Sequence, residues 1–278
     1  MHKITPGVFL ESKYPGVHIG AIVTDDGLML IDIPTRVEDG RSWISALSPY
    51  GKPRYLALLD THPDRVLGAR VLDFPLVAHD CTRKAMNGWS DSFKGGAHPI
   101  GAEADLLKRV TGVRNAIPEL TFSDHLVIYL GKREIHFWHR PGPTSGSMWV
   151  VLPESKVAFI GDTVTVAEPP YLGEADIENW LATLDFLRGS SMLSFTLVAS
   201  RDGLIERQDI NAMARFLRKV PRRVGRMSRG GNREEIAAKF AQQLIRDFEI
   251  PSGQQDHVLL RLQAGLTQLC TRMYPIEA

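Results

Sequence analysis

Three side chains with acid–base and metal-binding chemistry follow one apolar segment of the chain in close succession. Residues Arg54 to Leu59 are predicted to form a strand, and Asp60, His62 and Asp64 alternate in the loop after it. Alternation places these three polar side chains together at the end of the strand. Carboxylates and a neutral imidazole can bind a divalent cation or move protons. Arg65, whose guanidinium is permanently protonated, stands directly beside them.

Three later segments also bring polar groups to the ends of predicted strands. They are Arg-Pro-Gly-Pro-Thr-Ser-Gly-Ser-Met at residues 140–148, Val-Ala-Phe-Ile-Gly-Asp-Thr at residues 157–163, and Thr-Leu-Val-Ala-Ser-Arg-Asp-Gly at residues 196–203. The middle segment supplies Asp162, and the last supplies Arg201 and Asp202. Polar residues at the ends of several strands can converge on one pocket.

Taken in this order, the four segments resemble the metallo-β-lactamase superfamily. Its first motif, H-x-H-x-D-H-x-x-G, has the same frame as D-x-H-x-D-R-x-x-G in this chain. Asp60 stands at the first histidine position and Arg65 at the last, whereas His62 and Asp64 keep the family residues. The resemblance covers roughly residues 4–205 and implies an αββα sandwich, that is, two mainly antiparallel sheets flanked by helices.

The later motifs differ from the family pattern in a similar way. Pro143 stands where the P-G-H-T-x-G-S motif has its histidine, and it has no side-chain donor for a metal. Asp162 keeps the aspartate of the G-D-T motif, which bridges two metals in the family. The last family histidine falls on Asp202, or on Arg201 if the alignment moves by one residue.

These substitutions argue against the zinc chemistry that the resemblance implies. In the family, imidazole and carboxylate ligands hold metal ions that activate a water molecule. The first metal position would have Asp60, His62 and Pro143, and the second would have Asp64, Arg65 and Asp202. Arg65 would place a permanent positive charge where the second metal belongs.

We therefore predict a metal-free pocket in which Arg65 neutralises the carboxylates around it. The pocket residues are Asp60, His62, Asp64, Arg65, Pro143, Asp162 and Asp202. The alternative is a single divalent cation, manganese, magnesium, calcium or zinc, with oxygen-rich coordination. Its ligands would be Asp60, His62, Asp64, Asp162 and Asp202.

Three functional hypotheses follow. The favoured one is a non-catalytic member of the superfamily, a pseudoenzyme that binds a small molecule or takes part in an assembly. The second is a hydrolase of an ester, thioester or phosphoester with altered metal use and Asp64 as its general base. The third is nucleic-acid binding through the basic stretch 218–229, which the net charge of +1 disfavours.

Composition limits the class of protein further. The chain has 278 residues, of which 44% are hydrophobic and 23% charged, as in ordinary globular proteins. Its two cysteines, Cys81 and Cys270, exclude a disulfide framework and fit the reducing cytoplasm. The first residues show no signal-peptide pattern, and no apolar run has the length of a membrane span.

Hydrophobic patterns predict the elements that position the pocket. Strands are expected at 17–24 and 28–32, and at 148–152 and 156–160, as two hairpins. Helices are expected at 37–47, 66–72 and 176–187. Residues 82–119 show no clear pattern, but Trp89, Phe93 and Gly95-Gly96 within them could form a mobile flap over the pocket.

The chain is predicted to divide at about residue 220. Residues 1–220 form the αββα domain, and residues 221–278 form a basic linker and a C-terminal helical hairpin. Pro221, Gly225 and Gly230-Gly231 indicate the linker, and Pro251-Ser252-Gly253 would separate two helices at 232–248 and 254–273. These helices could pack on the core or on a second subunit.

Overall fold

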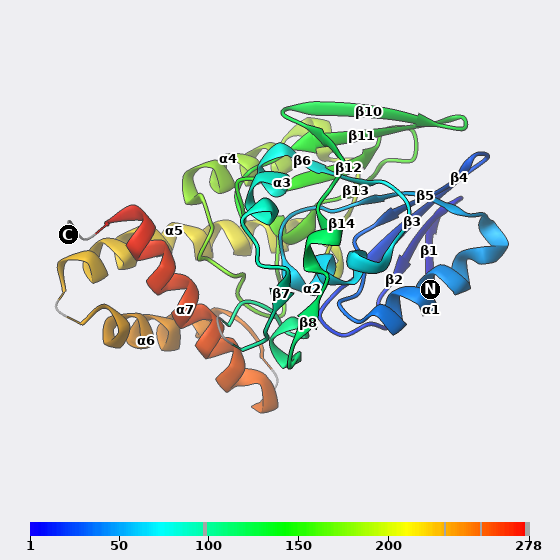
Figure 1. The fold of residues 1–278 in the computed structure, drawn as a ribbon. Helices are drawn as coiled ribbons and strands as arrows, with labels where there is room; N and C mark the ends of the chain where they lie inside the picture. Colours follow the sequence, from blue (N-terminus) through cyan, green and yellow to red (C-terminus); the bar gives the residue numbers. More distant parts are fainter. Residues whose placement is uncertain (97–98, 231, 251, 276–278) are drawn as a thin grey trace.

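Two β-sheets form the centre of the protein (Figure 1). The computed structural model describes residues 1–96, 99–230, 232–250 and 252–275. The first sheet has the order β1 (His2–Thr5), β2 (Val8–Glu11), β3 (Ile19–Thr24), β4 (Gly27–Ile31), β5 (Pro53–Ala57), β6 (Leu76–His79) and β9 (Leu120–Phe122). Strands β1 to β4 are antiparallel neighbours, and β4, β5, β6 and β9 are parallel.

The second sheet continues the chain in sequential order. Its strands are β10 (His125–Leu130), β11 (Arg133–His139), β12 (Met148–Leu152), β13 (Val157–Phe159), β14 (Thr196–Ala199) and β15 (Gly203–Ile205). The β13–β14 pair is parallel, and the other neighbours are antiparallel. Both predicted hairpins are confirmed, as β3–β4 and β12–β13. A two-stranded ribbon, β7 (Ser92–Phe93) and β8 (Val110–Thr111), lies apart from both sheets.

The alternating direction of side chains along the strands produces the four layers. Along β12, Val150 and Leu152 join the core between the sheets, whereas Trp149 and Val151 face the helices on the other side. Helices α1 (Val37–Leu47) and α3 (Asp80–Asn87) pack on the outer face of the first sheet. Helices α4 (Ile177–Arg188) and α5 (Arg207–Arg229) pack on the outer face of the second. The predicted αββα sandwich is therefore confirmed.

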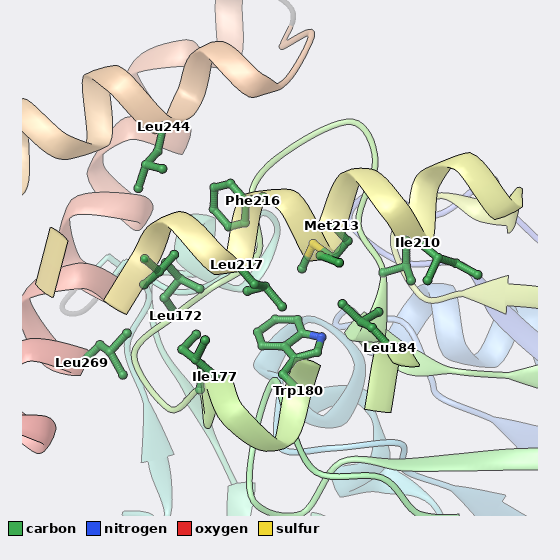
Figure 2. Close-up of a cluster of buried hydrophobic side chains, with 14 of the residues drawn as sticks. Leu172, Ile177, Trp180, Leu184, Ile210, Met213, Phe216, Leu217, Leu244 and Leu269 are labelled. Carbon is green, nitrogen blue, oxygen red and sulfur yellow. The ribbon is translucent and has the colours of Figure 1, made fainter. Parts of the chain in front are cut away.

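Helix α4 shows how the sequence fixes one of these layers. It begins as predicted, because the Asp176 side chain accepts a hydrogen bond from the backbone N–H of Asn179. Trp180 and Leu184 then enter the cluster that joins α4 to α5 (Figure 2). Trp180 has no exposed surface, and its ring N–H donates to the carbonyl of Thr163 at 2.8 Å. That bond connects the helix layer to the turn that carries Asp162.

The basic stretch 218–229 is helical, so the prediction of a linker at this point was wrong. It forms the second half of α5, with Pro221 inside the helix and exposed. Val220, Val224 and Met227 recur at helical spacing and are fully buried. Their burial outweighs the loss of one backbone hydrogen bond at proline.

The two predicted C-terminal helices are present as α6 (Arg233–Leu244) and α7 (Gln255–Met273). Leu244 of α6 and Leu269 of α7 reach the same cluster as α4 and α5 (Figure 2). A 3₁₀ turn, Ser252–Gln254, precedes α7. Gly231 and Pro251, which were predicted to break the helices, lie outside the described residues. No helix in the described parts of the chain is both long and apolar enough to cross a membrane.

Candidate functional site

Residues 58–62 connect β5 to a short helix, α2 (Pro63–Val66), at one edge of the two sheets. The expected helix over 66–72 is instead this single turn, followed by a 3₁₀ turn at Leu67–Val71. His62 caps α2, since its ring accepts a hydrogen bond from the backbone N–H of Asp64. The backbone N–H of Met148 donates to the carbonyl of Leu59 at 2.9 Å, which fixes this edge to β12 of the second sheet.

Gly68 lets this loop pack closely against the segment that follows β4. A Cβ atom at this position would lie 1.9 Å from the carbonyl oxygen of Pro34, a backbone atom that cannot yield. The glycine of the first motif is therefore required by packing. It brings α2, and with it Arg65, against the end of β4.

Arg65 lies at the centre of the site and has no exposed surface. Its guanidinium donates a hydrogen bond of 3.1 Å to one oxygen of Asp162 and lies 3.0 Å from the other. It also donates a hydrogen bond of 2.5 Å to Asp60. Its Nε atom lies 3.5 Å from a carboxylate oxygen of Asp32. Burial alone would lower the pKa of Arg65, but Asp162, Asp60 and Asp32 together raise it well above its ordinary value. The side chain is a permanent cation held by three carboxylates.

Asp162 is ionised under all ordinary conditions. Burial raises its pKa, but Arg65 and Arg201 oppose this effect and hold the pKa well below the usual range. Its carboxylate receives hydrogen bonds from both arginines, the Arg201 bond being 3.2 Å long. The residue that bridges two metals in the family pattern therefore bridges two guanidinium groups here.

Asp32 supports the cluster from the end of β4. It accepts hydrogen bonds from the backbone N–H of Leu59 and from the hydroxyl of Ser200, at 3.0 and 2.9 Å. Burial raises its pKa to about 7, although Arg65 acts in the opposite direction. Its backbone adopts a left-handed conformation, with φ of 54°, which aspartate tolerates better than most residues.

Asp64 is directed away from Arg65 and binds a neighbouring loop. Its carboxylate accepts three backbone N–H groups, from Ala102, Glu103 and Ala104, at 2.7 to 3.1 Å. A Cβ at Gly101 would lie 2.5 Å from the same carboxylate, so only glycine fits there. Burial raises the pKa of Asp64, but charged neighbours and the N–H donors bring it below its ordinary value.

This loop is the part of residues 82–119 that covers the site. Besides its contact with Asp64, its Ile100 carbonyl lies 3.0 Å from Nε2 of His62. The residues that were predicted to form a flap lie behind the loop, where Trp89 and Phe93 pack with Leu67 and Ala104. Together they leave His62 with 6% of its surface exposed and Asp64 with none.

His62 is a neutral imidazole. Burial is the largest effect and, with Arg201 and Arg65, lowers its pKa to about 4. Nδ1 accepts the N–H of Asp64, and Nε2 lies 2.6 Å from an Arg201 nitrogen. Because Nδ1 accepts, the neutral ring carries its proton on Nε2, which donates to the Ile100 carbonyl and cannot also accept from Arg201.

The last motif contributes Arg201 to the site, and not Asp202. Arg201 contacts Asp162, His62 and Glu168, with a bond of 2.6 Å to Glu168. Asp202 instead accepts the backbone N–H groups of Val166 and Ala167, both at 2.9 Å. Asp202 was predicted to lie in the pocket with Arg65, but its carboxylate binds the backbone at Val166 and Ala167. Arg201 is the residue of this motif that contacts Asp162.

Several residues of the site had no sequence signal. Glu168 accepts hydrogen bonds from Arg201 and from Arg261 of α7, each at 2.6 Å. Glu174 accepts a hydrogen bond from the Thr61 hydroxyl. These residues belong to no motif, and only tertiary packing brings them to the site. Pro143 is buried in a turn closed by the hydrogen bond from Gly142 to Thr144 and adds no polar group.

Comparison with known proteins agrees with the fold and the motifs. A family model described as the metallo-β-lactamase superfamily matches residues 61–191. No curated protein sequence matches the chain. A solved metallo-β-lactamase from Pontibacter korlensis is 18% identical with a TM-score of 0.59, over 78% of this chain and 97% of that chain. The match to the metallo-β-lactamase superfamily thus covers residues 61–191, and the fold is the one that these solved structures share.

Two further structures are similar over nearly the whole chain. The metallo-β-lactamase family protein TTHA1429 from Thermus thermophilus is 16% identical with a TM-score of 0.65, over 98% of this chain and 95% of that chain. The sec-alkylsulfatase Pisa1 from Pseudomonas sp. is 17% identical with a TM-score of 0.69, over 99% of this chain and 50% of that chain. At these identities the similarity shows the fold alone.

The side chains present do not fit the metal centre that the family implies. Within the described ranges, no group of three or more histidine, cysteine, aspartate or glutamate residues could hold a metal ion. The guanidinium of Arg65 lies between Asp60 and Asp162, and the Asp64 carboxylate already accepts three backbone N–H groups. A cation at this place would have to displace a buried arginine from its three carboxylates.

Proposed function

We propose that this chain is a metal-independent, non-catalytic member of the superfamily, a binding or assembly protein whose former metal pocket is held by an Arg–carboxylate cluster. The observation that carries the proposal is the position of Arg65, which is fully buried and bonded to both Asp60 and Asp162. A permanent charge at this point supplies the neutralisation that metal ions give in zinc enzymes.

Electrostatics disfavours a metal ion beside this arginine. At about 4 Å and an effective dielectric constant near 20, a divalent cation and a guanidinium repel each other by about 8 kcal/mol. The cation would also compete for oxygens that already bind Arg65, at 2.5 Å for Asp60 and 3.0 to 3.1 Å for Asp162. A metal ion could bind favourably only through side chains that are not already bonded to Arg65.

The alternative, a hydrolase with one non-standard metal, receives less support. It needs Asp64 as a ligand or general base, but Asp64 is fully buried, accepts three N–H groups and has a lowered pKa. A base must reach the proton that it removes and have a pKa near the working pH. It also needs Asp202, which binds the backbone at Val166 and Ala167.

Elemental analysis of protein purified without chelator tests the proposal. We expect well below one zinc or manganese per chain, and an unchanged midpoint of thermal unfolding after addition of zinc or EDTA. Stoichiometric metal that disappears in Asp162→Ala, but stays in Asp25→Ala as an exposed control, would overturn it. Hydrolysis of an ester, thioester or phosphoester that depends on added metal would overturn it as well.

A second candidate, contact with nucleic acid, is favoured by one observation. Arg218, Arg222, Arg226 and Arg229 are all exposed and follow one another at helical spacing on α5. They extend over about 16 Å of the helix, and i, i+4 neighbours lie about 6 Å apart. Salt-sensitive binding of a labelled oligonucleotide that is lost in the double variant Arg222→Ala, Arg226→Ala would support this role. Absence of binding at low salt would remove it.

A further inference from the structure

A cavity of about 560 Å³ lies beside the Arg–carboxylate cluster, between the sandwich and α7. Its wall is formed by three loops of the αββα domain, at residues 15–16, 102–106 and 167–168, by residues 201–202, and by the start of α7. The start of α7, drawn in orange in Figure 1, contacts the segment before the loop at 102–106 through His257, whose ring lies 3.2 Å from the carbonyl of Gly101. The volume lies in the range of small-molecule sites.

Two buried arginines share one carboxylate in this cavity. Arg201 and Arg261 both line it, and each donates to a different oxygen of Glu168 at 2.6 Å. Arg201 has a second carboxylate partner in Asp162. Among the described residues, Arg261 pairs only with Glu168, which it shares with Arg201. The single negative charge of Glu168 therefore does not fully neutralise Arg261.

Arg261 also keeps an unpaired donor. Only 6% of its surface is exposed, and its Nε atom is buried without a hydrogen-bond partner in the part of the chain that the structure describes. Buried N–H groups in proteins are nearly always paired. A guanidinium that is kept buried, under-neutralised and incompletely bonded at a cavity wall is suited to an anionic ligand.

The start of α7 adds to the positive character of this wall. Gly253 and Gln254 line the cavity, and no side chain among the described residues caps the N-terminus of this 19-residue helix. The helix dipole therefore favours negative charge at this end. His257, one turn before Arg261 on the same face, also lines the cavity; its Nε2 contacts the carbonyl of Gly101 and lies 3.4 Å from the carboxylate of Asp105.

The acidic residues of the lining are already engaged. Asp202 accepts two backbone N–H groups, and Glu103 pairs with Arg36 at 3.0 Å. Much of the remaining wall is apolar, with Leu106, Ile250 and Val258 among its residues. A ligand with one charged end and one apolar end would match both parts of the cavity.

We propose that this cavity binds a small organic anion, whose carboxylate or phosphate group contacts Arg261 and the first turn of α7 and whose apolar part lies against Leu106, Ile250 and Val258. The proposal rests on the proposed function, because a metal ion held near Asp162 and His62 would itself attract an anion. The proposal names the class of ligand for a cavity that lies beside the Arg65–carboxylate cluster but is not lined by Asp60, Arg65 or Asp162.

Isothermal titration of the full-length protein with phenyl phosphate, after treatment with EDTA and desalting, tests this site. We expect saturable binding with one ligand per chain. Arg261→Gln should weaken it by about ten- to a hundredfold, because a charged hydrogen bond is lost from a buried site. Arg218→Gln, an exposed arginine outside the cavity, serves as the matched control and should leave the affinity unchanged.

A steric variant covers the case in which Arg261→Gln fails to fold. Ala167 is exposed and lines the cavity, so Ala167→Trp should fill it and abolish binding without removing a charge. Absence of saturable binding, equal affinity for the neutral benzyl alcohol, or full affinity in both variants would overturn the inference. Binding of phenyl phosphate only after zinc is added would refute the proposed function instead, because the phosphate group would then be bound by the metal ion.

Discussion

Replacement of Arg65 removes the cation that Asp32, Asp60 and Asp162 share. Arg65→Met keeps much of the side-chain volume while it deletes the charge and the hydrogen bonds to Asp60 and Asp162. The carboxylates stay where they are, with 1%, 2% and 5% of their surfaces exposed, so water cannot take the place of the guanidinium. Among the described residues, only Arg201 is left to pair with one of them, Asp162, at 3.2 Å.

The expected loss can be worked out from this geometry. Removal of one member of a buried ion pair costs about 3–5 kcal/mol, because the partner is left charged and unpaired. Folded domains have a total stability of roughly 5–15 kcal/mol. Arg65→Met should therefore lose a large share of its free energy of unfolding at neutral pH.

The pH dependence gives the sharper signature. In the wild type, Arg65 and Arg201 depress the pKa of Asp162, so its contribution to stability is present at neutral pH and is lost only in strong acid. In Arg65→Met the unpaired Asp60 and Asp162 should have raised pKa values, and their protonation relieves the repulsion. The deficit of the variant should therefore shrink between about pH 7 and about pH 5.

Urea unfolding followed by circular dichroism, at both pH values, measures the effect. Arg218→Met, which removes an exposed arginine, is the matched control and should change stability by less than about 0.5 kcal/mol. Addition of Asp60→Asn and Asp162→Asn to Arg65→Met should recover part of the loss. If Arg65→Met lies within about 1 kcal/mol of the wild type at neutral pH, the buried ion-pair network does not hold the pocket together.

Three further predictions concern the frame of the site. Burial raises the pKa of Asp32 from 3.8 to about 7, so the native state holds this proton more tightly than the unfolded chain does. The stability that the bound proton contributes is complete below about pH 4 and is lost as the pH rises through about 7. Asp32→Asn, which cannot ionise, should therefore become more stable relative to the wild type over this interval in the same urea assay. Gly101→Ala should push the loop 102–104 off Asp64 and make it sensitive to limited proteolysis, and an unchanged cleavage pattern would speak against the clamp. Gly68→Ala places a methyl group against the Pro34 carbonyl and should yield little soluble protein, a result that normal expression and melting would contradict.

Much of the fold could be predicted from local patterns. Apolar runs separated by short polar turns indicated the β3–β4 and β12–β13 hairpins, and the aspartate cap with a helical stripe indicated α4. The basic stretch 218–229 was misassigned, because Pro221 and the arginines suggested a linker while Val220, Val224 and Met227 bury a helical face. Propensity is a local property, but the burial that overrides it depends on what packs against the helix.

The residue types at the positions of the family's metal ligands are a property of the sequence alone, and above all Arg65 brings a fixed charge into the motif. How those residues are used depends on the tertiary structure. In the folded chain, Asp64 binds the backbone at 102–104, and Arg201 rather than Asp202 contacts Asp162. Arg261 of α7 pairs with Glu168. Each of these contacts joins segments far apart in the chain, and the direction of a side chain at a strand end is set by those partners, which no local pattern encodes.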